Sequence, residues 1–93
     1  MKIKLEAREF KTRESAHKYL KEILELPEYY GENLDALYDC LGEVYKETLF
    51  IIPEKIADKE HLGEYGETMI RVFKDAAEEN PNIKVKIKKS KIK

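Results

Sequence analysis

The segment from Leu49 to Ile52, with the sequence LFII, constrains the fold more than any other part of the chain. It is an unbroken run of large apolar residues, and Pro53 closes it. Four residues are too few for a helix, and a short apolar run without polar alternation is typical of a buried strand in a parallel sheet. The segment therefore predicts the best-covered strand of a sheet.

Two further segments, residues 3–7 and residues 83–87, alternate apolar with charged side chains. A period of two residues predicts a strand with one face buried. The sequence therefore predicts a short first strand and a third strand near the end of the chain. The apolar positions are Ile3, Leu5 and Ala7 in the first segment and Ile83, Val85 and Ile87 in the second.

Three other segments space their apolar residues as amphipathic helices do. Thr12 is a suitable N-cap for the first helix, which must end before Pro27. Asn33 is placed to cap a second helix that runs to about Tyr45. The third helix is expected over residues 67–79, because an Asn-Pro-Asn sequence follows it.

Residues 54–65 are mostly polar and predict a short helix or a turn. The order of elements is then β-α-α-β-(α)-α-β, and strands joined through helices favour a parallel sheet with right-handed crossovers. We therefore expect an α/β fold in which a small three-stranded parallel sheet packs with three to four helices. A chain of 93 residues fits one domain, 1–93, with residues 88–93 as a basic tail that frays past the last strand.

The composition excludes several classes of protein. No apolar run approaches the roughly 18 residues of a membrane span, and residues 1–5 lack the apolar core of a signal peptide, so we expect a cytoplasmic protein without a membrane partner. Cys40 is the only cysteine and is expected as a reduced, half-buried thiol. His17 and His61 have no partner at catalytic spacing and are expected on the surface, so we predict no metal and no cofactor.

The net charge of −1 is unevenly distributed along the chain. Residues 27–47 carry six acidic side chains and one basic, whereas residues 84–93 carry six lysines. Charge distribution bears on partners rather than on fold. The lysine-rich end has no interleaved aromatic residues and the rest of the chain is acidic, so we expect no nucleic-acid binding.

The second helix carries two carboxylates on one face. On a helical wheel, Asp35 and Asp39 lie opposite the apolar stripe, in company with Gly42. The helix dipole accounts for an acidic residue in the first turn, but Asp39 lies a turn further in, where Asp35 repels it. Helix stability therefore explains Asp35 but not Asp39.

Tyrosines surround these carboxylates. Tyr29 and Tyr30 precede the helix, Tyr38 lies on it, and Gly31 allows a close approach of the backbone. Tyrosine is enriched at protein interfaces, so we interpret the set as an acidic, aromatic-rimmed binding face, with a merely solvated helix as the alternative. An exposed pair of carboxylates has no desolvating pocket to separate their pKa values, which argues against an enzyme.

The sequence LPEYYGENLDALYDCL, residues 26–41, resembles the corresponding segment of the barstar family, intracellular inhibitors of secreted bacterial ribonucleases such as barnase. His17 and the sequence VFKDA, residues 72–76, add to a resemblance that extends from residue 1 to about residue 88. The resemblance implies the α/β fold described above and an inhibitor rather than an enzyme.

The resemblance also implies roles for single residues. In this family the second helix and the loop before it enter the ribonuclease active site, and the aspartate that matches Asp39 occupies the position of a substrate phosphate. Asp35 would pair with a second basic group, and Asp75 stands where the family has a glutamate that makes a peripheral charge contact. Tyr38 replaces a family tryptophan, and residues 42–45 lack another. The implied loop contacts are Tyr29, Tyr30, Gly31 and Asn33.

We therefore predict a protein that is monomeric when free and blocks a small basic, barnase-like ribonuclease in a 1:1 complex by mimicking RNA phosphate. The replaced tryptophans leave an alternative open. In that alternative the same fold acts as an immunity protein or interaction module for a different basic toxin or regulator.

Overall fold

The computed structural model describes residues 1–89, in which strands and helices alternate around a parallel sheet. The predicted α/β class with a three-stranded parallel sheet is confirmed. In chain order the elements are β1 (Lys2–Lys4), the 3-10 helix η1 (Ala7–Glu9), α1 (Arg13–Ile23), α2 (Leu34–Gly42), β2 (Thr48–Pro53), the 3-10 helix η2 (Glu54–Ala57), α3 (Glu64–Glu79) and β3 (Ile83–Lys88).

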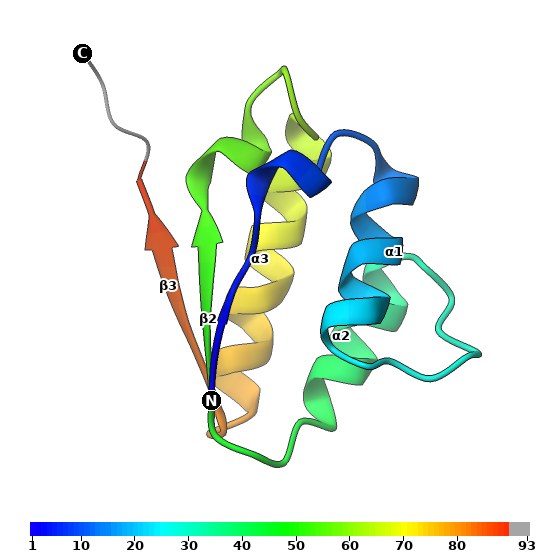
Figure 1. Cartoon of the computed structure of the whole chain (residues 1–93). Coiled ribbons are helices and arrows are strands. Elements are labelled where there is room, and N and C mark those ends of the chain that lie inside the picture. The colour runs from blue at the N-terminus through cyan, green and yellow to red at the C-terminus, as the bar shows by residue number, and fades with distance from the viewer. Residues whose placement is uncertain (90–93) are drawn as a thin grey trace.

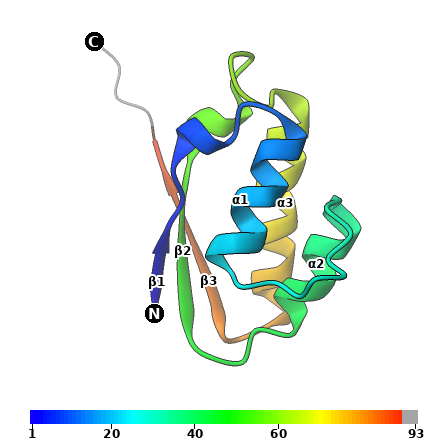
Figure 2. The ribbon, with the colours of Figure 1, turned by 45° about the vertical axis from the view of Figure 1, so that its right-hand side comes forward.

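The sheet has the order β1-β2-β3, and both neighbouring pairs of strands are parallel. The apolar strand β2 is therefore central. Its Phe50 lies in register between Ile3 of β1 and Val85 of β3. The α-helices lie on one side of this sheet, and α2 lies farthest from it (Figures 1 and 2).

The core fills the space between the sheet and the helices. Phe50 and Ile52 on the inner face of β2 are fully buried, and the ring of Phe50 meets that of Phe73 on α3 edge to face at a centroid distance of 5.1 Å. Leu20 of α1 and Leu37 of α2 are also fully buried. Each helix thus buries its predicted apolar stripe in one shared core.

The outer face of β2 is less covered than its inner face. No α-helix lies over it, and Leu49, Ile51 and Pro53 are half-buried while Phe50 and Ile52 are inaccessible. Successive side chains of a strand point to opposite faces, so only every second residue reaches the helices. The prediction that this segment is the best-covered strand of the sheet is confirmed, because β2 has no exposed residue whereas β1 and β3 each carry exposed lysines.

Local hydrogen bonds define both ends of α1. Thr12 caps its start as predicted, since its hydroxyl accepts from the backbone N–H of Ser15 and the Ser15 hydroxyl accepts from that of Thr12. The helix ends before Pro27, with Glu25 in the left-handed region at φ 54° and the N–H of Leu26 donating to the carbonyl of Lys21 at 2.9 Å.

The end of α2 corrects the prediction. The helix was expected to reach Tyr45 but ends at Gly42. The side-chain amide of Asn80, which is buried, donates to the carbonyl oxygens of Leu41 at 3.0 Å and Val44 at 2.9 Å. A residue distant in sequence therefore binds the carbonyl group of Leu41, which a helix continuing to Tyr45 would have paired internally.

Other boundaries differ by a few residues. The helix expected over residues 67–79 begins earlier, at Glu64, and residues 54–65 contain the predicted short helix as η2. Ala7 belongs to η1 rather than to the first strand. In the predicted tail, Lys88 is the last residue of β3, and residues 90–93 lie outside the described residues.

We predict that Gly66→Ala lowers the free energy of unfolding by about 1–3 kcal/mol, because a Cβ atom at this buried position of α3 would clash with the carbonyl oxygen of Ile56. Urea denaturation followed by circular dichroism measures the change. The matched control is Gly42→Ala, where no atom lies within 4 Å of the added Cβ and stability should stay constant or rise by up to about 1 kcal/mol. Equal effects of the two variants would contradict the packing described.

Candidate functional site

The outward face of α2 presents two unpaired carboxylates. Asp35 and Asp39 are both exposed, one helical turn apart, and neither forms an ion pair within residues 1–89. Leu37 and Leu41 on the opposite side of the helix are fully buried, which fixes the direction of the acidic face. The carboxylates are therefore available to a partner that presents positive charge.

Asn33 holds the loop of residues 26–33 against the start of α2. Its side-chain oxygen accepts from the backbone N–H of Ala36 at 2.7 Å, which is the predicted N-cap. Its side-chain nitrogen donates to the carbonyl oxygen of Gly31 at 3.3 Å. The Asn33 side chain thus fixes the position of the loop relative to α2.

The remaining predicted contact residues fall into exposed and buried sets. Tyr29 is 84% exposed and Tyr38 is 38% exposed. Gly31 and Gly42 are exposed as well. Asp75 is exposed on α3, the helix against which α2 packs. These residues therefore offer surface beside the two carboxylates or on the neighbouring helix.

Tyr30 differs from the other predicted contacts because its side chain turns inward. It is only 6% exposed, and its hydroxyl lies 2.6 Å from Nδ1 of His17. His17 is 2% exposed, so the prediction that it lies on the surface is wrong. Its Nε2 lies 2.7 Å from the hydroxyl of Tyr65 at the start of α3. His17 of α1 thus joins the loop to α3.

This histidine is held in its neutral form. A neutral imidazole donates from one nitrogen and accepts at the other, so one tyrosine hydroxyl accepts from the ring and the other donates to it. Burial lowers the pKa of His17 below its ordinary value of 6.5, and the nearby carboxylate of Glu32 opposes part of that effect. Burial also raises the pKa of Tyr30 and of Tyr65.

A charged hollow lies between the starts of α1 and α2, next to His17. Its charged lining residues are Arg13, Glu14, Glu32 and Asp35. The guanidinium carbon of Arg13 lies 4.2 Å from the ring centroid of Tyr65. This cation–π contact holds the Arg13 side chain against the wall of the hollow. Asp35 lines this hollow and also belongs to the acidic face of α2.

Cys40 lies at the other end of α2 as a free thiol of intermediate exposure, as predicted. Burial raises its pKa, and the carboxylates of Glu43 and Asp39 add to the shift. A thiol with a raised pKa is a weak nucleophile, so the arrangement does not favour covalent chemistry. No group of three or more potential metal ligands occurs in residues 1–89, and no helix there could cross a membrane.

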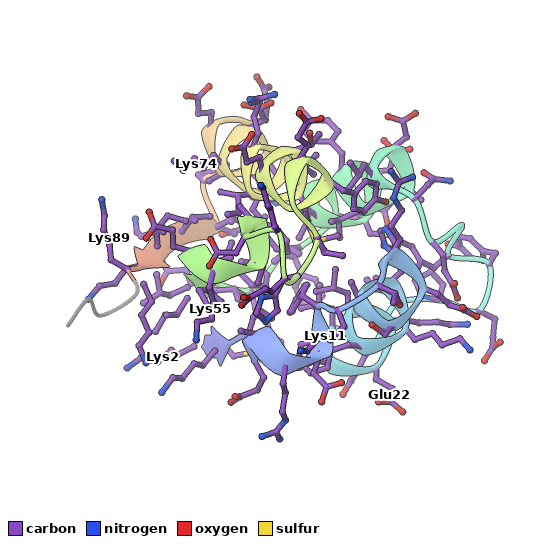
Figure 3. All side chains as sticks on the ribbon, turned by 90° about the horizontal axis from the view of Figure 1, so that it is seen from above. Lys2, Lys11, Glu22, Lys55, Lys74 and Lys89 are labelled. Atoms are coloured by element: carbon purple, nitrogen blue, oxygen red, sulfur yellow. The ribbon has the colours of Figure 1, made fainter. Side chains whose placement is uncertain are left out.

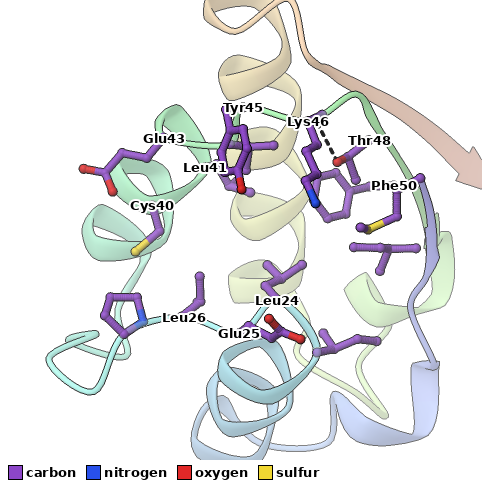
Figure 4. A pocket seen from close by; sticks show the side chains of 15 residues that line it. Leu24, Glu25, Leu26, Cys40, Leu41, Glu43, Tyr45, Lys46, Thr48 and Phe50 are labelled. Carbon is purple, nitrogen blue, oxygen red and sulfur yellow. Dashed lines mark hydrogen bonds between the residues drawn. The ribbon is translucent and has the colours of Figure 1, made fainter.

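Cys40 also borders a groove of about 390 Å³ between the ends of α1 and α2 and the strand β1 (Figure 4). Its lining is mainly apolar, with Leu24, Leu26 and Leu41 prominent, and Glu25, Glu43 and Lys46 at its rim. It is separate from the acidic face of α2. Its side chains supply packing surface but no constellation of reactive groups.

The comparison with known families identifies the chain. The family model described as "Barstar (barnase inhibitor)" matches residues 1–89. The chain belongs to the barstar family. It is also 38% identical over 79 residues to a protein of Bacillus subtilis (strain 168) that bears the name "Putative ribonuclease inhibitor YrdF", and the match covers 84% of this chain and 87% of that protein.

Sequence reasoning missed Tyr65 and Arg13 as neighbours of the loop. Tyr65 is 48 residues from His17 in the chain, and no spacing pattern connects the two. The tertiary fold brings the two side chains within hydrogen-bond distance. His17 itself had a signal, because it stands next to Ala16 in the apolar part of α1.

We predict that the free energy of unfolding falls as pH decreases from 7 to 5, because the unfolded chain, whose His17 has the higher pKa, takes up a proton more readily than the folded protein. This contribution is present above about pH 6.5 and is lost in acid. Urea denaturation at several pH values measures it. In His17→Gln the fall should be smaller, whereas His61→Gln leaves the bonds to Tyr30 and Tyr65 intact and should keep it. An unchanged fall in His17→Gln would contradict the prediction.

Proposed function

We propose that this barstar-family protein inhibits a small basic ribonuclease by placing α2 and the preceding loop in its active site. The observation that carries the proposal is the pair Asp35 and Asp39, which are exposed, free of ion pairs within the described chain and fixed on one helix face. The family description and the name of the Bacillus subtilis relative support a ribonuclease as the target.

The proposed mechanism is mimicry of phosphate. An enzyme that cleaves RNA must present arginine, lysine or histidine side chains to the phosphate group, and carboxylates satisfy the same donors. Asp39, in the second turn of α2, is the principal anchor, and Asp35 pairs with a second basic group. Because the helix is rigid, little conformational entropy is lost when these carboxylates bind. Inhibition then follows from occupation of the active site.

The other exposed residues complete the proposed interface. Tyr29, Tyr38 and Gly31 contribute contact area around the carboxylates, and Asn33 holds the loop in position. Gly42 lies at the end of the face, and Asp75 adds a peripheral charge from α3. Tyr30 is buried and does not contact the partner. Its hydrogen bond to His17 positions the loop.

We propose that the complex contains one copy of each protein and that the inhibitor is a cytoplasmic monomer when free. The acidic face is formed by a single chain and needs no second copy. A ribonuclease that folds before export would degrade the RNA of the cell that makes it. An inhibitor in the cytoplasm would prevent this.

We predict that Asp39→Ala weakens inhibition of barnase by about 2–5 kcal/mol, or roughly 30-fold to several thousand-fold, because basic groups of the enzyme would stay buried without a counter-charge. Titration of barnase activity on a fluorogenic RNA substrate measures the inhibition constant. The control variant is Glu22→Ala, which removes one exposed negative charge from α1 and should change inhibition less than about threefold.

Three outcomes have separate meanings. If Asp39→Ala and Glu22→Ala have equally small effects on the inhibition constant, α2 is not the binding site. Failure of the wild-type protein to inhibit barnase would contradict a barnase-like partner. Failure with barnase, together with capture of a different basic toxin from the native organism, would favour the alternative target that the replacement of a family tryptophan by Tyr38 allows.

We also predict that the association rate falls about tenfold or more when ionic strength rises from about 0.01 M to 0.15 M, while the dissociation rate changes little. Opposite charges on inhibitor and enzyme accelerate encounter, and salt screens their attraction over distances beyond about 8–10 Å. Stopped-flow fluorescence measures both rates. An association rate independent of salt would contradict recognition by the acidic face.

A further inference from the structure

The outer face of the sheet, which no α-helix covers, carries a regular array of lysines. Side chains alternate along each strand, so the residues on this face are those in register with Leu49, Ile51 and Pro53, and not those in register with the buried Phe50 and Ile52. The apolar members are Leu49 and Ile51 of the central strand. The lysine array, as we define it, consists of Lys2 and Lys4 of β1 and Lys84, Lys86 and Lys88 of β3.

The parallel register arranges these side chains in rows. Lys2, Leu49 and Lys84 form one row across the sheet, because each pair is in register. Lys4, Ile51 and Lys86 form the next row. Rows are about 6.6 Å apart along the strands, and the lysines of one row are about 10 Å apart across the sheet. Positive charge thus runs along both sides of a shallow apolar strip.

No acidic side chain belongs to the three strands, and none of the array lysines forms an ion pair within residues 1–89. Lysine on an edge strand protects against pairing with another chain, which explains one or two such residues. Five like charges on one small face repel one another, and edge protection does not require so many. The array therefore has an excess of positive charge that a ligand could neutralise.

The array leads into a hollow of about 600 Å³ at the carboxyl ends of the strands. Lys4 and Lys88 of the array reach it, and Lys55 of η2 and Lys89 join them. Glu6 and Asp58 also line this hollow, so lysines outnumber carboxylates there. Figure 3 shows Lys2, Lys55 and Lys89 at the sheet side of the molecule. The carboxyl ends of parallel strands are a frequent place for ligands in α/β folds.

We propose, contrary to the expectation from the sequence that the chain binds no nucleic acid, that the lysine array and this hollow bind the sugar-phosphate backbone of single-stranded RNA without preference for its bases. Repeated positive charges along a strand match a polymer with regularly repeated phosphates. The face has no aromatic side chain for base stacking and no arginine for bidentate base contacts, so the phosphates are the groups recognised.

Two other polyanions fit this face less well. Insertion into a membrane needs apolar side chains that stand above their surroundings, whereas Leu49 and Ile51 are half-buried between longer lysines. An acidic protein needs a shape that complements the sheet, but the face is a shallow strip with charge on both sides. An extended polymer can follow such a strip along its whole length.

This activity is separate from the proposed inhibition. The helix α2 and the sheet lie on opposite sides of α1 and α3 (Figure 2). Lysine variants on the sheet therefore leave the inhibitor site unchanged, and Asp39→Ala leaves the lysine array unchanged. The failure of one proposal does not imply the failure of the other.

The test measures fluorescence anisotropy of a labelled 20-nucleotide oligouridylate with the full chain at 50–200 mM salt. If four phosphates are contacted, log affinity falls with log salt at a slope of about −2.8, which is about 50-fold across this range. Lys4→Gln/Lys86→Gln should weaken binding at 50 mM salt at least tenfold and reduce the slope by about 1.4. Lys11→Gln/Lys18→Gln removes the same charge from two exposed positions outside the array, one just before α1 and one on it, and should change affinity less than threefold.

Lys4→Arg/Lys86→Arg keeps the charge and should bind within threefold of the wild type, which separates loss of charge from loss of fold. Inhibition of barnase should be the same in all these variants and the wild type. Equal weakening by the two glutamine pairs, or affinity independent of salt, would overturn the proposal. Tighter binding of polyglutamate, or binding only of phosphatidylglycerol vesicles, would also overturn it and would assign the face to an acidic protein or to a membrane.

Discussion

The packing of α3 against the inner face of β2 is the contact on which the arrangement of the other elements depends. Phe50 and Phe73 meet at the centre of this contact, and both are inaccessible to solvent. α2 packs on α3 and not directly on the sheet, so its buried side is determined by α3. Once Leu37 and Leu41 face inward, Asp35 and Asp39 must face outward. The proposed binding face is thus a consequence of core packing.

The same packing separates opposite charges within a chain whose net charge is only −1. All α-helices lie on one side of the sheet, so the side that carries α2 is acidic and the uncovered side of the sheet is basic. The net charge is therefore close to zero although two surfaces carry charges of opposite sign. Under the two proposals each surface attracts a different class of partner and repels the partner of the other. The barstar-family fold has room for both surfaces because neither uses the core.

Polar groups in the interior connect α1, α2 and α3 with the loop of residues 26–33. The buried amide of Asn80 ends α2 at Gly42, and His17 joins Tyr30 of the loop to Tyr65 of α3. Sequence patterns identified Asn33 as a cap because its hydrogen bonds are local, within three residues. They placed the end of α2 at Tyr45 and His17 on the surface, since the partners of Asn80 and of His17 are distant in sequence. The spacing of apolar residues predicts which apolar side chains are buried. It does not predict hydrogen bonds between polar groups that are distant in sequence.

The sequence by itself determined the class of fold, the three strands, the apolar stripes of the helices, the cap at Thr12 and the direction of the acidic helix face. All of these follow from the period of apolar residues and from contacts between near neighbours in the chain. Only the tertiary structure decided that Tyr30 turns inward, that no α-helix covers the outer face of β2, and that Lys2 and Lys4 share rows across the sheet with Lys84 and Lys86. The physical reason is that strand order and register depend on pairs such as Lys2 with Leu49 and Leu49 with Lys84, which are far apart in sequence, and no local pattern in the chain encodes such contacts.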